Sequence, residues 1–406
     1  MTGPFDPDRP LAIHSLTFLD EGDEVTVGRA DTNSYAVLPT DGAALLRQLQ
    51  EGMTPRQGKL WYAERYGEDV DIDEFLAVLD ELDLLVKDGE AGTTDQPVRW
   101  QRLGRAMFSP LAWFCYAGLI GGAIAAFVVW PQAAPHYQNL FFTQYLVVLE
   151  LGLFLGQMPL ILIHEAFHAL AGRRLGLSSS LHIGRRLYFL VFETAMDGLV
   201  VMPRRRRYLP ILAGMLADAV IFSTLTLIAV AVRLESLTGR VLLALAFATL
   251  LRLAWQLYVF LRTDIYFLVV TVLGCVDLHT TAHQMLRNRL NRLLGRRDRL
   301  ADEANWHPRD RAVARWYSWL MVAGYSFLVL VAVNAMIPAV IRMARIIIDR
   351  FHGVQPGTSI ADTAVFLGLN VAQFVIVVAV AIRSRRQARA ARGPMAEQPA
   401  AQPSTA

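Results

Sequence analysis

Cysteine is nearly absent from this chain, whose 406 residues include only Cys115 and Cys275. Both thiols lie in apolar stretches, so the sequence excludes a disulfide framework and a zinc site built from thiolates. Residues 1–10 are polar and rich in proline and do not resemble a signal peptide. We therefore expect the first part of the chain to stay in the cytoplasm, where it is made.

Charged residues are also scarce. They make up 18 % of the chain, whereas 54 % of it is hydrophobic and the mean hydropathy is +0.34. This composition excludes a purely water-soluble protein and indicates a polytopic membrane protein. The net charge of +3 hides an asymmetry, because residues 1–95 contain 21 of the 36 acidic groups and 7 of the 39 basic ones. An acidic head repels phosphate, so no nucleic acid is expected as a partner.

The predicted fold class is mainly α, a polytopic membrane helical bundle with a small N-terminal α/β domain like a winged helix. We expect a head over residues 1–95, a linker over 96–106, a membrane domain over 107–382, and a basic, then disordered, tail over 383–406. About six spans are predicted, with a re-entrant helix at 265–275 that is too short to cross alone. The spans are 108–130, 144–175, 208–234, 241–261, 316–343 and 361–382.

Within the head, alternating apolar and polar residues predict strands at 11–18, 24–28 and 34–38. Helical spacing then predicts a helix capped by Asp41, a second from Thr54-Pro55 to residue 66, and a third over 72–82. Beyond the second span, the segment 178–202 is rich in β-branched and aromatic residues and too interrupted to span. It predicts a hairpin beside the membrane that could accept a substrate as an added strand, although an ordinary connecting loop is an equal alternative.

The second span contains the residues that suggest a metal site. Near its inner end lie His164, Glu165 and His168, in the pattern HEAFH. Residues four apart share one helix face, so the two imidazoles could bind one metal ion while Glu165 reaches a water on it. Ionisable groups in a spanning helix cost roughly 2.5–3.5 kcal/mol each, and a metal would offset that cost. The alternative is a helix end that enters water and carries these residues by coincidence.

A catalytic zinc normally has three protein ligands and a water, so two histidines are not enough. The candidates for the third ligand are carboxylates in apolar surroundings, namely Asp218, Asp264, Asp197 and Glu193. Depth in the membrane does not exclude Asp218, and Asp264 lies at a break between apolar helices that could turn its carboxylate towards the metal. On the residues alone, Asp218 and Asp264 are equally good candidates.

Arginines indicate the orientation in the membrane. Arg102 and Arg105 precede the first span, and the pair 173–174 and the run 204–207 lie between the second and the third. By the positive-inside rule we expect a multi-pass protein of the inner (plasma) membrane with its head and the HEAFH end on the cytoplasmic face. The arginine-rich loop 277–315 is expected to contact the phospholipid bilayer.

Three segments carry a family resemblance: HEAFHALAGRRLG at 164–176, PRRRRYLPILAG at 203–214 and FLRTDIYFL at 260–268. They resemble the site-2 protease family of membrane-embedded zinc metallopeptidases, and more closely a bacterial branch known as peptide zinc metalloproteases. The third segment is similar to the family's NPFLRFDGYYLL, whose Asp binds zinc. The resemblance implies that His164, His168 and Asp264 bind Zn²⁺ and that Glu165 is the general base.

The head carries a second resemblance over TDGAALLRQLQEGMTPRQGKLWYAERYGEDVDIDEFLAVLDELDLLV. It is similar to the PqqD-like domain, which holds the leader of a ribosomally made peptide by strand addition. This implies a precursor peptide as partner and an exporter nearby, and the acidic charge would favour a basic peptide. The alternative is a soluble cap that only packs on the membrane domain.

The chain departs from the family pattern beside the predicted third ligand. The family's Asn and Pro are Tyr258 and Val259 here, and its Gly after the Asp is Ile265. The Asn is thought to hold or polarise substrate, so that role is lost or is supplied by Gln256 or Arg262, with Asp218 as a further supporting group. The predicted function is an intramembrane zinc metalloendopeptidase that cleaves a peptide or a membrane-protein segment by means of zinc-activated water, and that could mature a ribosomally made peptide held by the head. The alternative is a non-proteolytic component of peptide export or immunity that keeps a metal site.

Overall fold

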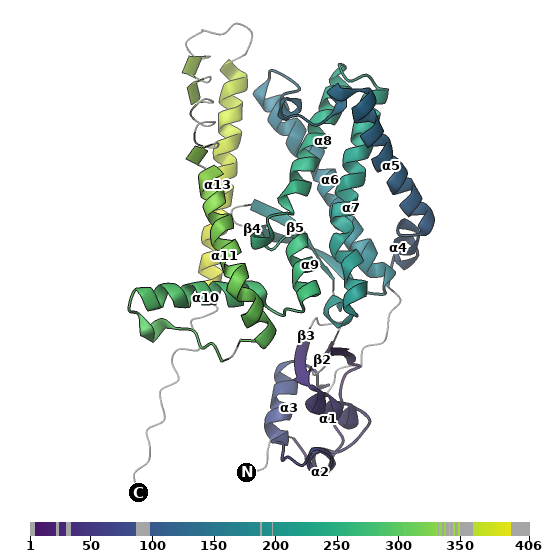
Figure 1. The fold of residues 1–406 in the computed structure, drawn as a ribbon, viewed down its shortest axis with the longest axis vertical. Helices are drawn as coiled ribbons and strands as arrows, with labels where there is room; N and C mark the ends of the chain where they lie inside the picture. Colours follow the sequence, from purple (N-terminus) through teal and green to yellow (C-terminus); the bar gives the residue numbers. More distant parts are fainter. Residues whose placement is uncertain are drawn as a thin grey trace.

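The computed structural model describes residues 5–21, 24–29, 34–86, 98–186, 189–196, 198–304, 306–331 and 360–390, with isolated residues between 333 and 349. The described part of the chain is mainly helical, with 71 % of its residues in helices. Long helices form an upright bundle, and the small head lies against its lower end in Figure 1. Residues 87–97, between the head and the bundle, lie outside the described part. The same is true of the predicted tail from residue 391 onwards.

The head is a three-stranded antiparallel sheet packed on three helices, with β2 as the central strand. Its elements are β1 (Thr17–Glu21), β2 (Glu24–Arg29), β3 (Ser34–Pro39), α1 (Thr40–Gln50), α2 (Pro55–Tyr66) and α3 (Ile72–Glu81). Val25 and Val27 of β2 are fully buried against Leu45 and Leu49 of α1 and Leu76 of α3. These apolar side chains supply the hydrophobic core that stabilises the head.

The second and third helices of the head confirm the predicted starts. Thr54 and Gln57 form a reciprocal capping box at the start of α2, and the Asp71 carboxylate caps α3. The predicted first strand, 11–18, is wrong over most of its length, because the ladder begins at Thr17. The segment before it packs on the core in extended form and makes a single bridge from Ile13 to Leu85.

The predicted cap by Asp41 is also wrong. The helix α1 begins two residues earlier than this cap predicts, at Thr40, and its N-cap is Pro39, without a side-chain hydrogen bond. The Asp41 carboxylate instead accepts a hydrogen bond from the Tyr62 hydroxyl of α2. This bond lowers the pKa of Asp41 and raises the pKa of Tyr62 to about 12. The Asp41 carboxylate therefore makes a tertiary hydrogen bond to Tyr62 instead of capping its own helix.

Among the described residues, five helices are long and apolar enough to cross a membrane: α5, α6, α7, α8 and α13. The chain is therefore a multi-pass membrane protein. The bounds are α4 (Gln101–Met107), α5 (Pro110–Val129), α6 (Leu146–Arg174), α7 (Arg204–Ala231), α8 (Leu237–Trp255), α9 (Asp264–Leu273), α10 (Leu278–Leu293), α11 (Pro308–Val331) and α13 (Ile360–Ala390). Five of the six predicted spans coincide with these five helices.

Four further predicted segments can be compared with the structure. The helix α4 occupies most of the predicted linker, and α11 covers the first half of the predicted span 316–343, whose remainder lies largely outside the described residues. The predicted re-entrant segment 265–275 corresponds to α9, which meets α10 at a bend of 89°. In Figure 1, α10 lies across the axis of the bundle. The strands β4 (Ser179–Arg186) and β5 (Phe189–Met196) pair antiparallel, which confirms the predicted hairpin.

The helix α6 is held at both ends. At its start, the backbone N–H groups of Leu146 and Val147 donate to the Asp362 carboxylate of α13, at 3.0 and 3.1 Å. A carboxylate at this end satisfies two free donors and complements the helix dipole. Towards its other end, α6 packs on α7 through small residues such as Ala171 and Ala217, which permit close approach in a membrane. The HEAFH segment lies in this close-packed part.

Candidate metal centre

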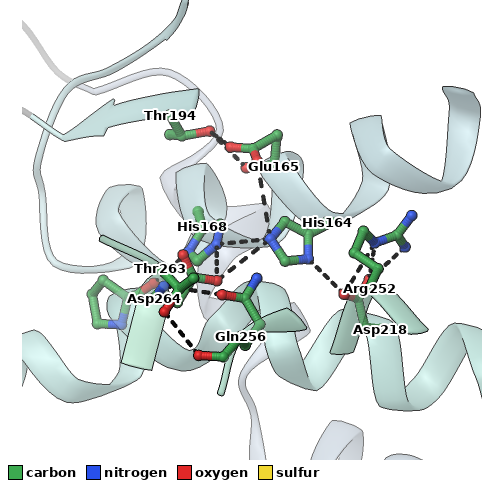
Figure 2. Close-up of polar contacts among 10 residues, drawn as sticks. His164, Glu165, His168, Thr194, Asp218, Arg252, Gln256, Thr263 and Asp264 are labelled. Carbon is green, nitrogen blue, oxygen red and sulfur yellow. Dashed lines mark hydrogen bonds and ion pairs between the residues drawn. The ribbon is translucent and has the colours of Figure 1, made fainter. Parts of the chain in front are cut away.

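His164, His168 and Asp264 converge on one point (Figure 2). The two histidines lie one turn apart on α6, and Asp264 is the first residue of α9. The histidine Nε2 atoms are 3.2 Å apart, and Asp264 Oδ2 lies 3.5 Å from Nε2 of His164 and 3.3 Å from that of His168. The two histidines are only 5 % and 6 % exposed. Together the three side chains form a group that can hold a metal ion.

The outer nitrogen of each imidazole is engaged, which leaves Nε2 facing the centre of the group. Nδ1 of His168 donates to the carbonyl of Pro210 on α7 at 2.8 Å. Because a carbonyl can only accept, Nδ1 carries a proton, and in the neutral ring Nε2 then carries a lone pair. Nδ1 of His164 lies 3.1 Å from Oδ2 of Asp218, a charge contact that lacks hydrogen-bond alignment. Metal-binding histidines usually have their other nitrogen held in this way.

The oxygen of Asp264 that faces the two histidines has no hydrogen-bond donor. Asp264 Oδ2 is buried and accepts no hydrogen bond from any described residue. It lies 3.3 and 3.5 Å from the Nε2 atoms of His168 and His164, which present lone pairs to it when the imidazoles are neutral. Burying a carboxylate without a compensating partner is costly, and close electron-rich atoms repel one another. A cation at the centre of the group would remove both penalties, so the three residues fit a metal ion.

The break between α8 and α9 positions Asp264. A short helical turn (Val259–Leu261) follows α8, and Thr263 then precedes α9. The Thr263 hydroxyl donates to the Gln256 carbonyl at 2.8 Å, and the Gln256 side-chain oxygen accepts from the Asp264 N–H at 3.0 Å. Gln256 is thus buried and engaged with the backbone that carries the ligand. Of its two predicted roles, substrate contact or support, the contacts correspond to support.

Asp218 lies behind His164 rather than among the ligand atoms. It is fully buried on α7, and its carboxylate accepts hydrogen bonds from Arg252 of α8, at 2.6 Å from Nη2 and 3.1 Å from Nε. Arg252 also donates to the side-chain oxygen of Gln157 on α6, at 2.8 Å. This chain of contacts joins three spanning helices and ends on His164. Of the other two candidate ligands, Asp197 lies outside the described residues, and so does the side chain of Glu193.

Gly214 gives the histidines their space. It lies on α7, and a Cβ added at this position would collide with the imidazoles of both His164 and His168. A glycine in a spanning helix ordinarily allows close helix packing. The contact is more specific, because the side chains that fill the space left by the missing Cβ are two of the predicted ligands. A glycine at this point therefore permits the metal group to form beside α7.

Glu165 is held next to the metal group and is 8 % exposed. The hydroxyl of Thr194 on β5 donates to Glu165 Oε2 at 2.7 Å, while Oε1 lies 3.9 Å from Nε2 of His164. The same hydroxyl is 3.1 Å from the Glu165 backbone carbonyl. The hairpin thus fixes the carboxylate with one oxygen directed towards the group, as Figure 2 shows.

A cavity of about 770 Å³ connects this site with the head. Glu165, His168 and Asp264 line it at the metal group, and Thr194 lines it from β5. Three residues of the head sheet, Glu24, Thr26 and Val37, line the same cavity. The volume lies within the range of about 300–1,000 Å³ that is typical of ligand sites. The head is therefore a wall of the space in front of the metal group.

Two residues of the site were missed by the sequence analysis. Arg252 could have been found, because a lone arginine within a predicted span needs a partner, and Asp218 in the preceding span is the obvious one. Thr194 carries no such signal, since threonine is common in strands.

Comparison of the chain with models of protein families, with curated proteins and with solved structures finds no match. The fold and the site by themselves define a class: a multi-pass membrane protein with a buried His–His–Asp group that can hold a metal ion. No family assignment adds to this description. The function must therefore be argued from the geometry of the site.

Proposed function

We propose that this protein is a membrane-embedded zinc metallopeptidase that cleaves a peptide or a membrane-protein segment. The observation that carries the proposal is the position of Glu165. Its carboxylate lies beside a group of three ligands, with one oxygen held by Thr194 and the other 3.9 Å from His164 Nε2. Three protein ligands, an open position and a neighbouring base are what hydrolytic zinc sites combine.

Zinc is the ion that the spacing favours. Two imidazoles and one carboxylate also bind iron(II), in octahedral sites. Ligand atoms about 2.0–2.1 Å from a tetrahedral ion lie about 3.3 Å apart, whereas octahedral neighbours at the same bond length lie about 2.9 Å apart. The separations of 3.2, 3.3 and 3.5 Å are closer to the tetrahedral value.

The residues divide the reaction between them. Zinc, when bound, would polarise the peptide carbonyl and lower the pKa of a water molecule. Glu165 would accept the proton of the attacking water and then give it to the leaving amine, as the C–O bond forms and the C–N bond breaks. Thr194 would hold the carboxylate in position between the two proton transfers. Asp218 and Pro210 would keep the imidazoles oriented.

The walls of the cavity support a peptide substrate. Phe192, Thr194 and Met196 alternate along β5 and all line the cavity, so an extended chain beside β5 would lie in front of the metal group. Residues of the head line the same cavity. We infer that it is a winged-helix-like recognition domain of the PqqD-like kind that delivers a ribosomally made precursor, with an exporter as a further partner.

The arginines around the site support a cytoplasmic orientation. Arg102 and Arg105 belong to α4, which packs on the HEAFH end of α6, and Arg173 and Arg174 close α6 itself. The head and the metal group share one cavity, so they lie on the same side. The positive-inside rule places this side in the cytoplasm of a cell whose inner membrane holds the bundle.

Removal of the metal is expected to abolish cleavage reversibly. Full-length protein in lipid nanodiscs would be incubated with a mass-encoded peptide library and with candidate precursor peptides. The zinc-loaded protein should cleave at least one of them, a chelator should lower that rate by at least about 100-fold, and one equivalent of zinc should restore it, because the water depends on the ion. Mass spectrometry of the products provides the measurement. Cleavage at full rate by protein shown to be free of metal would contradict the proposal.

A protein that binds zinc and peptide but cleaves nothing would instead support the non-proteolytic alternative, a component of peptide export or immunity. The observation that favours this second candidate is the replacement of the family's Asn, Pro and Gly by Tyr258, Val259 and Ile265. These positions flank the turn that carries Asp264. The metal group itself does not depend on them, because Gln256 and Thr263 hold that turn.

A further inference from the structure

Arg262 adopts a backbone conformation that side chains rarely take. Its φ and ψ angles are 57° and 44°, in the left-handed region, at the end of the turn Val259–Leu261. Leu261 before it and Thr263 after it are both buried, so the backbone is held on either side. The left-handed region is unfavourable for a residue with a Cβ, and such a conformation persists only where the surrounding structure holds it, often at a functional site. Here the result is an exposed guanidinium on the wall of the metal-site cavity.

The guanidinium of Arg262 has no anionic partner. Among the residues that the structure describes, it makes no hydrogen bond and no ion pair within 4.0 Å. The other carboxylates of the cavity that lie away from the metal group are already engaged. Glu24 lies 3.1 Å from Nε2 of His307, and Asp277 accepts from the backbone of Thr280 at 3.4 Å as the cap of α10. Arg262 therefore presents an unpaired guanidinium to a cavity in which the carboxylates of Glu24 and Asp277 already have partners.

Two further arginines add positive charge to the cavity that Arg262 faces. Arg204 and Arg207 line it from the start of α7. Arg262 is also only two residues from Asp264. A group bound by Arg262 would therefore lie within a few peptide residues of the metal group, at about 3.3–3.6 Å per extended residue.

We propose that Arg262 binds a carboxylate of the peptide substrate and so selects a peptide with an anionic group close to the scissile bond. A guanidinium binds a carboxylate through two parallel N–H···O bonds, which gives both affinity and direction. The carboxylate can be an Asp or Glu side chain or the C-terminus of the peptide. This inference rests on the proposed function and specifies its substrate. It complements the acidic head, which favours a basic segment elsewhere in the same peptide.

The test is peptide binding to zinc-loaded full-length Glu165→Gln protein in nanodiscs, measured by fluorescence polarisation. One probe series moves a single Glu along a neutral, C-terminally amidated peptide, and its controls carry Gln or Lys at the same positions. A second series has no acidic side chain and differs only in a free or an amidated C-terminus. At one position, or at the free C-terminus, the anionic peptide should bind about 10- to 100-fold more tightly than its neutral control. The series in which the difference occurs identifies the source of the carboxylate.

Arg262→Gly in the same background is the decisive variant, because glycine relieves the left-handed backbone and the protein should fold at least as stably. It should bind anionic and neutral peptides equally and keep its affinity for the neutral one. Arg262→Glu should reverse the preference towards Lys, whereas Arg296→Gln, an exposed arginine outside the cavity, should leave it unchanged. Unchanged discrimination in Arg262→Gly would overturn the inference. Discrimination without cleavage by the wild type would instead reject the proposed function and retain the carboxylate site.

Discussion

Replacing Glu165 with Gln is expected to lower the rate of peptide cleavage by about 10²- to 10⁴-fold while the protein keeps its zinc. The amide has nearly the same shape and can still accept the hydrogen bond of Thr194, so the site should stay intact. It cannot take a proton from water. Cleavage of the best library peptide and the zinc content would be measured on the same preparation, so that loss of the base is separated from loss of the metal.

Glu150→Gln is the matched control for this experiment. Glu150 lies on the same helix, roughly 22 Å along its axis from Glu165, and accepts hydrogen bonds from Asn370 and Gln373 of α13. The single amide oxygen of Gln can keep one of these two bonds, and the site is far from the metal group, so the cleavage rate should change little. Equal rates in wild type and Glu165→Gln would show that another group acts as the base, or that cleavage comes from a contaminant.

Gly214→Ala is expected to have the second-largest effect, through the metal. The added Cβ would collide with the imidazoles of His164 and His168, so at least one ligand must move. Mutation of a residue that only orients a metal ligand typically weakens metal binding by about 10- to 100-fold, and displacement of the ligand itself should exceed that range. Zinc affinity would be measured by competition with a fluorescent chelator, and cleavage should fall with zinc occupancy.

The matched control for this variant is Gly121→Ala on α5, where a Cβ would meet no described atom within 4 Å. Glycine to alanine normally favours a helix by about 0.5–1 kcal/mol. Both variants share that gain, so a loss of zinc confined to Gly214→Ala reports the steric contact. Wild-type zinc affinity in Gly214→Ala would mean that the histidines do not occupy the positions described.

The sequence predicts much of the architecture, because local composition and residue spacing identify membrane spans and amphipathic helices. The same local reasoning cannot choose between Asp218 and Asp264. Both lie at a suitable depth, and helical arithmetic does not tell which face of α7 meets His164. The choice depends on Gln256 and Thr263, whose bonds turn the start of α9 inwards. The family resemblance favours Asp264, and the geometry agrees with that choice.

Other parts of the site have no local signature. The Pro210 carbonyl that orients His168 is a backbone group, which any residue would supply. Thr194 acts through its place in the hairpin register, opposite Leu181, and not through its residue type. Gln256 and Arg262, the two predicted substitutes for the family's Asn, can be told apart only by their contacts. Gln256 is buried against the backbone that carries Asp264, whereas Arg262 faces the cavity. Tertiary packing, which spacing does not reveal, decides all three.

The most direct test of the account is the zinc content of three purified proteins: wild type, Asp264→Ala and Asp218→Asn. Wild type should hold one zinc per chain, and Asp264→Ala should lose it during purification, because a ligand is gone. Asp218→Asn should retain zinc with an affinity weakened about 10- to 100-fold, as expected for a residue that orients His164 without touching the metal. Full zinc occupancy in Asp264→Ala would contradict the metal centre described here. The contradiction would be sharper if Asp218→Asn also lost its zinc completely, because Asp218 would then be the ligand.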